Sequence, residues 1–86
     1  MSETQLNNLV GEFQLMPGFT LTITVEKGEL TIQATGQPKI AFRAKTKSEF
    51  FNQALQAKIV FELDGEGKAT GLTLFQAGQE LKGNRM

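Results

Sequence analysis

The chain has no cysteine, histidine, tryptophan or tyrosine, and it has only two serines among its 86 residues. Without cysteine there is no disulfide and no thiolate chemistry, and without histidine the commonest general base and metal ligand is missing. Neither Ser2 nor Ser48 lies in a Gly-x-Ser-x-Gly turn or has a lysine three residues later, so neither matches an acylating serine motif. We therefore expect no catalytic residues, no metal ligands and no cofactor, and a protein that is not an enzyme.

The chain also lacks an excess of charge of either sign, because nine basic residues balance nine acidic ones. Nucleic acids and anionic membranes attract proteins with a concentrated positive field, so we expect neither as a partner. The first residues are polar, and no apolar run follows them that could serve as a signal peptide or a membrane span. If the chain is complete, the expected location is the cytoplasm; if it was cut from a longer protein, the location is open.

What the chain does contain is regular alternation of apolar and polar residues, which is clearest over residues 19–34. Residues 19–26 alternate without interruption, Lys27-Gly28 forms a turn, and residues 29–34 alternate again. This period of two with one apolar face is typical of an antiparallel sheet that covers a core. A single register opposes the apolar residues of one face: Val25 to Leu30, Ile23 to Ile32 and Leu21 to Ala34.

A second hairpin is predicted over residues 57–76, with its turn at residues 64–67. A register that opposes Leu63 to Lys68 brings the apolar sides together, with Ile59 across from Leu72 and Ala57 across from Leu74. Further strands are expected at residues 12–15, 39–44, 49–52 and 79–82, although the facing of Phe50 and Phe51 stays unassigned. Residues 3–9 are predicted to form a short helix, with Ser2 or Thr4 as its cap.

These elements predict an all-β fold within one domain spanning residues 1–86. Seven to eight short strands at intervals of about 8–12 residues favour an antiparallel meander that forms a small barrel or half-barrel, preceded by a short N-terminal helical turn. The side chains expected to point inward are large, and a barrel this small is normally filled by its own side chains. Ile23, Ile32, Phe61 and Leu72 are the residues expected at the centre of the core.

Several polar patterns suggest chemistry but are better explained as turns or solvated strand faces. Residues 65–70 resemble a phosphate-binding loop, but Ala69 stands where a hydroxyl would bind magnesium, and a strand follows instead of a helix. Glu62, Asp64 and Glu66 lack the closing glutamate of a calcium loop. The same structural interpretation applies to the Glu26 and Glu29 pair beside a turn and to the exposed threonines, Thr20, Thr22, Thr24 and Thr31.

Two apolar residues, Val60 and Phe75, fall on the side of the second hairpin opposite the core residues. One explanation is that the N-terminal turn covers them through Leu6, Leu9 and Val10. The other is that they form an interface with a partner domain or a second subunit. The sequence leaves both explanations open.

The chain also resembles a known family. The resemblance rests on the order of four stretches. They are Leu6-x-x-Leu9-Val10-Gly11-Glu12-Phe13, then Gly28-x-Leu30-x-x-Gln33-x-x-Gly36-Gln37-Pro38, then Phe50-Phe51, then residues 59–78 with their glycines and alternating apolar positions. This order is similar to the small C-terminal domain of unknown function appended to beta-lactamase-related serine hydrolases and some peptidases. Leu9 and Phe13 stand where tyrosines are usual in that family.

The resemblance implies a lipocalin-like β fold and a non-catalytic accessory role, with a hydrolase domain in a longer parent chain as the partner. It carries over no catalytic residue, because the family's hydrolase chemistry belongs to a separate domain. The alternative function is that of a free-standing small β-barrel module that binds a small apolar ligand. We also expect a homodimer, formed through a sheet edge or through the side that bears Val60 and Phe75.

Overall fold

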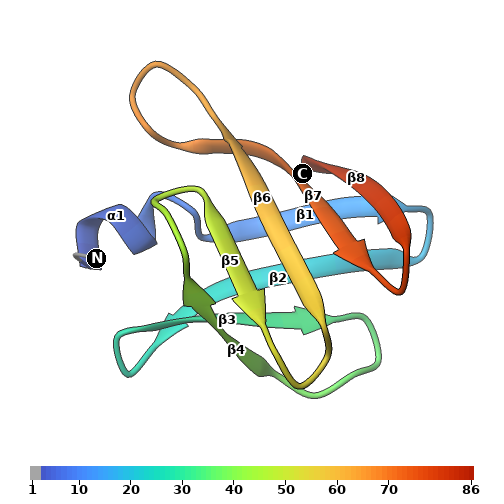
Figure 1. Cartoon of the computed structure of the whole chain (residues 1–86). Coiled ribbons are helices and arrows are strands. Elements are labelled where there is room, and N and C mark those ends of the chain that lie inside the picture. Colours follow the sequence, from blue (N-terminus) through green and yellow to red (C-terminus); the bar gives the residue numbers. More distant parts are fainter. Residues whose placement is uncertain (1–2) are drawn as a thin grey trace.

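In the computed structural model, which describes residues 3–86 and the side chains of residues 5–86, the chain forms one short helix and eight strands (Figure 1). Consecutive strands pair antiparallel, and the last strand returns to the first, so the sheet closes into a barrel. No helix of these residues is long and apolar enough to cross a membrane. The elements are α1 (Glu3–Asn7), β1 (Gly11–Met16), β2 (Phe19–Glu26), β3 (Glu29–Ala34), β4 (Ile40–Ala44), β5 (Glu49–Asn52), β6 (Ala57–Leu63), β7 (Ala69–Gln76) and β8 (Gln79–Arg85).

The all-β meander with a short N-terminal helical turn is therefore confirmed, and the barrel is closed. The helix ends at Asn7, two residues before its expected end, and the proposed caps, Ser2 and the Thr4 side chain, lie outside the described residues. The strand expected at residues 79–82 extends to Arg85.

The first hairpin has the predicted register, with Val25 opposite Leu30, Ile23 opposite Ile32 and Leu21 opposite Ala34. The short turn between β2 and β3 fixes this register. Lys27 and Gly28 both have positive φ angles, 53° and 77°, as a two-residue turn of the mirror-image type requires. Ala77 and Gly78 repeat this turn between β7 and β8. Because the turn has only two residues, a change of register would require a turn of different length and type.

The predicted register of the second hairpin is wrong by two residues. Ile59 lies opposite Leu74 instead of Leu72, and Ala57 lies opposite Gln76 instead of Leu74. The pairing shifts between Glu62 and Leu63, where a bulge places Leu63 opposite Ala69 instead of Lys68. Over residues 57–62 the error is two residues, so the opposing side chains keep their predicted face. At Leu63 the error is one residue, and Ala69 is buried in the place that the predicted register gave to Lys68.

The core fills the inside of the barrel. Three phenylalanine rings meet at its centre, since Phe61 packs edge-on against Phe13 and Phe50 with ring centroids 5.9 and 5.7 Å apart. Such edge-to-face pairs are a favourable geometry for aromatic rings. Phe50 is thus the inward residue of β5, which was unassigned from the sequence, and the expected core residues Ile23, Ile32, Phe61 and Leu72 are all buried. Leu6 and Leu9 join the same cluster.

Arg85 holds together the seam at which β8 meets β1. Its Nε donates a hydrogen bond to the carbonyl oxygen of Ala69 at 2.6 Å, and its Nη2 donates one to the carbonyl oxygen of Val10 at 2.8 Å. The guanidinium also lies over the ring of Phe13, 5.1 Å from the centroid. One side chain thereby joins the start of β7, the start of β1 and the core.

The sheet is also weakly paired between β4 and β5, where only two residue pairs form, Arg43 with Phe51 and Ala44 with Phe50. Beyond these pairs the strands separate, and a side chain replaces the backbone ladder. The Nδ2 of Asn52 donates a hydrogen bond to the carbonyl oxygen of Ala41 at 3.0 Å. The Oδ1 of Asn52 accepts one from the backbone N–H of Leu55, also at 3.0 Å. Asn52 therefore fixes the loop between β5 and β6 beside β4.

Candidate functional site

The outer surface of strands β5 to β8 carries the residues predicted as an interface. Because Ile59 and Phe61 point into the core, the residues between and before them, Val60 and Lys58, point outward. Cross-strand pairing then sets out two rows on this surface, which we call the β5–β8 face. The first row is Phe51, Lys58, Phe75 and Glu80, and the second is Glu49, Val60, Thr73 and Lys82.

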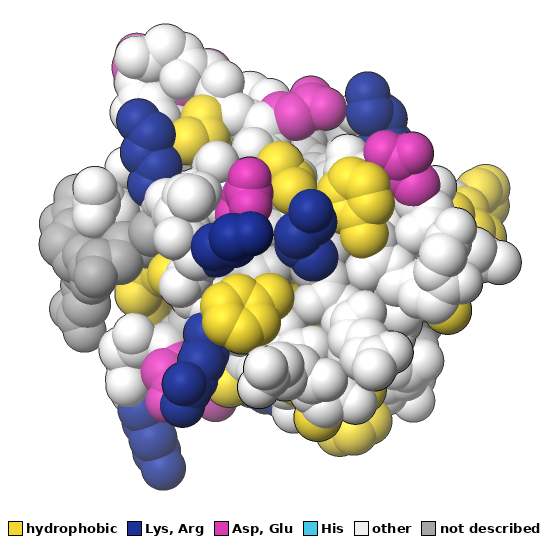
Figure 2. Space-filling model, viewed as in Figure 1, with side chains coloured by type: hydrophobic (Ala, Val, Ile, Leu, Met, Phe, Trp, Pro, Cys, Tyr) yellow, Lys and Arg dark blue, Asp and Glu magenta, His cyan; other side chains and the backbone are white. Residues whose placement is uncertain are grey.

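The β5–β8 face mixes apolar and charged side chains (Figure 2). Phe51, Val60 and Phe75 are half-buried, and the ammonium of Lys58 lies 4.8 Å from the ring centroid of Phe75. Lys82 lies 3.7 Å from Glu62, but both side chains are largely exposed, so this ion pair adds little stability. Thr73 is only 7% exposed although it points outward, which shows how closely its neighbours cover it.

The N-terminal turn does not account for the position of Val60 and Phe75. Leu6 and Leu9 pack into the core cluster inside the barrel, and α1 contacts β2. Val60 and Phe75 belong neither to that cluster nor to the partly buried residues packed against it. Their prediction as an interface stays a prediction. The sequence analysis missed Phe51, which lies two strands from Phe75 in the same row, because nothing local showed which of two adjacent phenylalanines faces outward.

A second feature is a cavity of about 100 Å³ inside the barrel, where β4 and β5 separate. Its walls come from β2, β3 and β4 on one side and from β6, β7 and the β5–β6 loop on the other. The deeper lining is apolar, and the amide side chains Gln37 and Gln76 stand at the rim. The apolar lining residues are Phe19, Leu21, Ile32, Ala34, Pro38, Ile40, Phe42, Leu55, Ala57, Ile59 and Leu74. We call this feature the mouth cavity.

The acidic residues considered for calcium binding serve the turn between β6 and β7. The Oδ1 of Asp64 accepts hydrogen bonds from the backbone N–H groups of Lys68 at 3.0 Å and Glu66 at 2.8 Å. These bonds, with Lys68 first, hold the pKa of Asp64 below its ordinary value. In the described part of the chain, no three His, Cys, Asp or Glu side chains gather in a way that could hold a metal ion.

Ser48 also has a structural role. Its backbone N–H donates a hydrogen bond to Oγ1 of Thr46 at 3.3 Å, and its carbonyl oxygen accepts one from the N–H of Phe61 at 2.8 Å. These bonds connect the loop before β5 with the middle of β6. The backbone of Ser48 therefore contributes to the fold at a place where sequence reasoning had considered only its hydroxyl.

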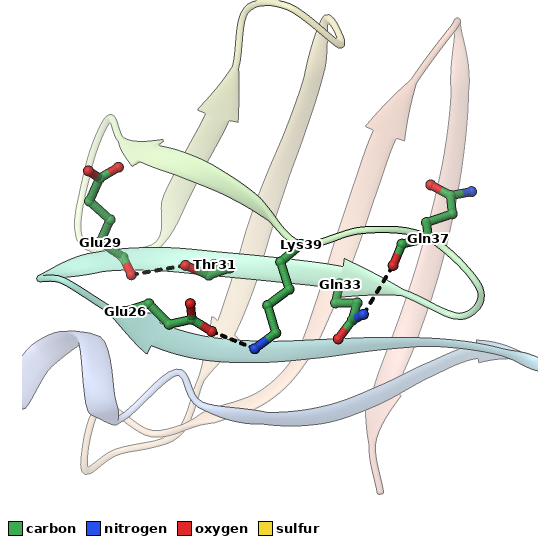
Figure 3. Close-up of polar contacts among 6 residues, drawn as sticks. All are labelled: Glu26, Glu29, Thr31, Gln33, Gln37 and Lys39. Carbon is green, nitrogen blue, oxygen red and sulfur yellow. Dashed lines mark hydrogen bonds and ion pairs between the residues drawn. The ribbon is translucent and has the colours of Figure 1, made fainter.

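The polar surface of β2, β3 and β4 is held by contacts among its own residues (Figure 3). The Nζ of Lys39 lies 2.7 Å from the carboxylate of Glu26, and this hydrogen bond, together with the charge of Lys39, lowers the pKa of Glu26. Glu26 and Glu29 pair across the hairpin but do not act as a carboxylate pair, since Glu26 is engaged by lysine. Thr31 donates a 3.4 Å hydrogen bond to the carbonyl oxygen of Glu29. These contacts agree with the structural interpretation of this surface, but the prediction that Thr31 is exposed is wrong, because this residue is only 6% exposed.

The geometry defines a class: a small up-and-down β-barrel with a filled core, an outer face that mixes apolar and charged side chains, and a small cavity with mainly apolar walls. The chain belongs to the family described as "Domain of unknown function (DUF3471)", whose family model matches residues 1–85. No curated protein and no solved structure matches the chain.

Proposed function

We propose that this barrel is a non-catalytic accessory domain of a longer protein, and that its β5–β8 face packs against a serine hydrolase domain of the beta-lactamase-related type. The observation that carries the proposal is the set of outward apolar side chains on the two rows of this face, Phe51, Val60 and Phe75, each half-buried in the isolated domain. Support for the partner comes from the resemblance of residues 6–82 to domains appended to such hydrolases.

The chemistry of the β5–β8 face suits contact between domains. Aromatic residues are enriched at interfaces and contribute much of the binding free energy when they become fully covered. Lys58 lies over Phe75, so its aliphatic stem extends the apolar surface while its ammonium can reach a partner carboxylate. Glu49, Glu80 and Lys82 stand at the margins of the two rows, where charged residues of an interface rim are usual.

The proposal is tested by comparing hydrogen exchange of the isolated chain with that of a parent protein containing it. Amides on β5, β6 and β7 should exchange more slowly in the parent, whereas amides on β2 and β3 should exchange at unchanged rates. Replacing Phe75 with glutamate should abolish the difference. Gln14→Glu, an exposed position on β1, is the matched control and should leave it intact. Equal exchange in both forms would contradict docking through this face.

The same face gives an expectation for the isolated chain. With no partner domain present, two copies should associate through it and form a two-fold dimer at high concentration. Sedimentation of the wild type should show this dimer, and Phe75→Glu should yield a folded monomer. A strictly monomeric wild type would remove the homodimer but would leave the domain contact untouched, because exchange measures that contact separately.

A second candidate function is the binding of a small apolar molecule. The specific observation in its favour is the mouth cavity, whose deeper walls are entirely hydrophobic. At about 100 Å³ it is well below the volume of a typical drug-sized site, roughly 300–1,000 Å³. Only a thin part of a molecule, such as a hydrocarbon chain, fits within it.

A further inference from the structure

The mouth cavity adjoins a second hollow, because the two share part of their lining. The hollow has a volume of about 240 Å³ and is lined by residues of the β5–β6 loop, β7 and β8. Three residues, Leu55, Leu74 and Gln76, line both spaces. Leu55 is 39% exposed and lies on the loop that Asn52 fixes beside β4. Of the two leucines that line both spaces, Leu55 is the one on a loop, so its side chain is the one expected to move if the two spaces join.

The lining of both spaces offers no charge to a ligand. Among the described residues that line either space, none is acidic or basic. The polar groups are amides, with Gln37 at the rim of the mouth cavity, Gln56 and Gln79 in the adjoining hollow, and Gln76 in both. Gln76 continues the inward series of β7 after Leu72 and Leu74, so its side chain is aimed at the opening.

The lysine next to the rim is directed elsewhere. Lys39 follows Pro38 of the cavity rim, but its ammonium extends along the outside of the sheet to Glu26, at 2.7 Å (Figure 3). The backbone carbonyl of Gln37 accepts a 3.1 Å hydrogen bond from Nε2 of Gln33, which holds this loop against β3. An anionic head group at the opening would therefore find amide donors but no free cation among these residues.

We propose that the mouth cavity binds the alkyl chain of an uncharged amphiphile, whose alcohol, amide or ester head is held by the glutamines of the rim, and that it discriminates against fatty carboxylates. The inference rests on the second candidate function and adds the class of ligand. Amide groups pair well with neutral oxygen and nitrogen atoms. They do not compensate a full negative charge that loses part of its hydration beside apolar walls.

The geometry also sets the dependence on chain length. Each buried methylene should raise the affinity about fourfold, until the chain has filled the space available. With the Leu55 side chain in its present position the rise should stop at a short chain, because the mouth cavity holds only about 100 Å³. With Leu55 displaced it should continue into the adjoining hollow of about 240 Å³. The chain length at which the affinity levels off therefore reports whether Leu55 moves.

The experiment is a titration of the folded chain with 1-butanol, 1-hexanol and 1-octanol and with octanoate at pH 7, followed by methyl chemical shifts. We expect saturable shifts at Leu55, Ile59 and Leu74, unchanged shifts at Val60, and binding of octanol at least about tenfold tighter than binding of octanoate.

Gln76→Lys, at an exposed rim position, should reverse this preference by supplying a cation. Ala34→Leu, on the cavity wall, should weaken octanol binding about tenfold or more, whereas Ala41→Leu, which is exposed on β4, should not.

The outcomes separate the two levels of the proposal. Octanoate binding as tight as octanol binding would overturn the neutral-head inference while the apolar-ligand function stands. The absence of saturable shifts for every alcohol would overturn both. Shifts that map to Val60 instead of the cavity residues would also overturn both, because the ligand would then bind on the β5–β8 face. None of these results depends on the folding of a variant, since the wild-type titration yields each of them.

Discussion

Truncation of Phe61 tests the central claim that one aromatic cluster holds the barrel together. Phe61 is 3% exposed and contributes both edge-on ring contacts of the cluster, to Phe13 and to Phe50. Replacing a buried phenylalanine with alanine costs about 3–5 kcal/mol, because the transfer free energy is lost and a cavity remains. We expect Phe61→Ala to fall in the upper part of this range, since two rings lose their partner together.

The magnitude is large for a domain of this size. At about 0.05–0.15 kcal/mol per residue, 86 residues give a total stability of roughly 4–13 kcal/mol. A loss of about 3 kcal/mol should lower Tm by roughly 12–24 °C. Urea unfolding followed by far-ultraviolet circular dichroism measures the change directly, and the m-value shows whether the folded state has changed.

Two further variants make the result interpretable. Phe61→Leu keeps most of the volume but loses the ring edges, and should cost about 1–1.5 kcal/mol. Phe75→Ala removes a phenylalanine that is only half-buried, and should cost about 1–1.5 kcal/mol. If Phe61→Ala destabilised the chain no more than Phe75→Ala does, the aromatic cluster would not be the centre of the core.

The remaining predictions concern Arg85, Gly11 and the two carboxylates with lowered pKa values. Arg85→Met removes the hydrogen bonds to Ala69 and Val10, and should cost about 1–3 kcal/mol and speed amide exchange along β1; an unchanged exchange rate there would contradict the role of Arg85. Gly11→Ala should cost about 1–3 kcal/mol by urea unfolding, because φ is 154° and the added Cβ would collide with the Arg85 guanidinium. Stability should fall on acidification, because folding lowers the pKa of Glu26 and Asp64 from their ordinary values of 4.5 and 3.8. The two ionised carboxylates therefore stabilise the fold at a pH above those ordinary values, and this stabilisation is lost as the pH falls through the lower folded-state pKa values. Lys39→Met and Asp64→Asn should each flatten that decline between pH 5 and about pH 3, and an unaltered decline would show that other groups cause it.

The two hairpins show where sequence alone is sufficient and where it is not. In the first hairpin the two-residue turn at Lys27 and Gly28 leaves one register, and that register was predicted. In the second hairpin, registers that differ by two residues satisfy the alternation equally well. The observed register is set by the bulge at Leu63 and by the turn, in which Oδ1 of Asp64 accepts a hydrogen bond from the backbone N–H of Lys68.

Other features depend on contacts between parts of the chain far apart in sequence. Adjacent Phe50 and Phe51 have the same preference for either face, and Phe50 lies inside because Phe61 and Phe13 lie there. Residues 82–85 are polar and show no alternation, yet they form a strand because Gly83 fits against Leu15 and Arg85 reaches Val10. The mouth cavity lies between β2 to β4 and the segment from the β5–β6 loop to β7, and no local pattern records that these segments face one another.

The contact between Arg85 and Val10 joins residues 75 positions apart, whereas most other strand pairs join neighbours along the chain. Closing so long a loop costs much conformational entropy unless the strands between are already paired. We therefore expect the pairing of β1 with β8 to form last during folding. Until it forms, β1 and β8 are two free strand edges at opposite ends of an otherwise complete meander. In a crowded refolding solution the β8 of one molecule can meet the β1 of another before its own, which makes strand exchange at this seam the expected route to misassembly.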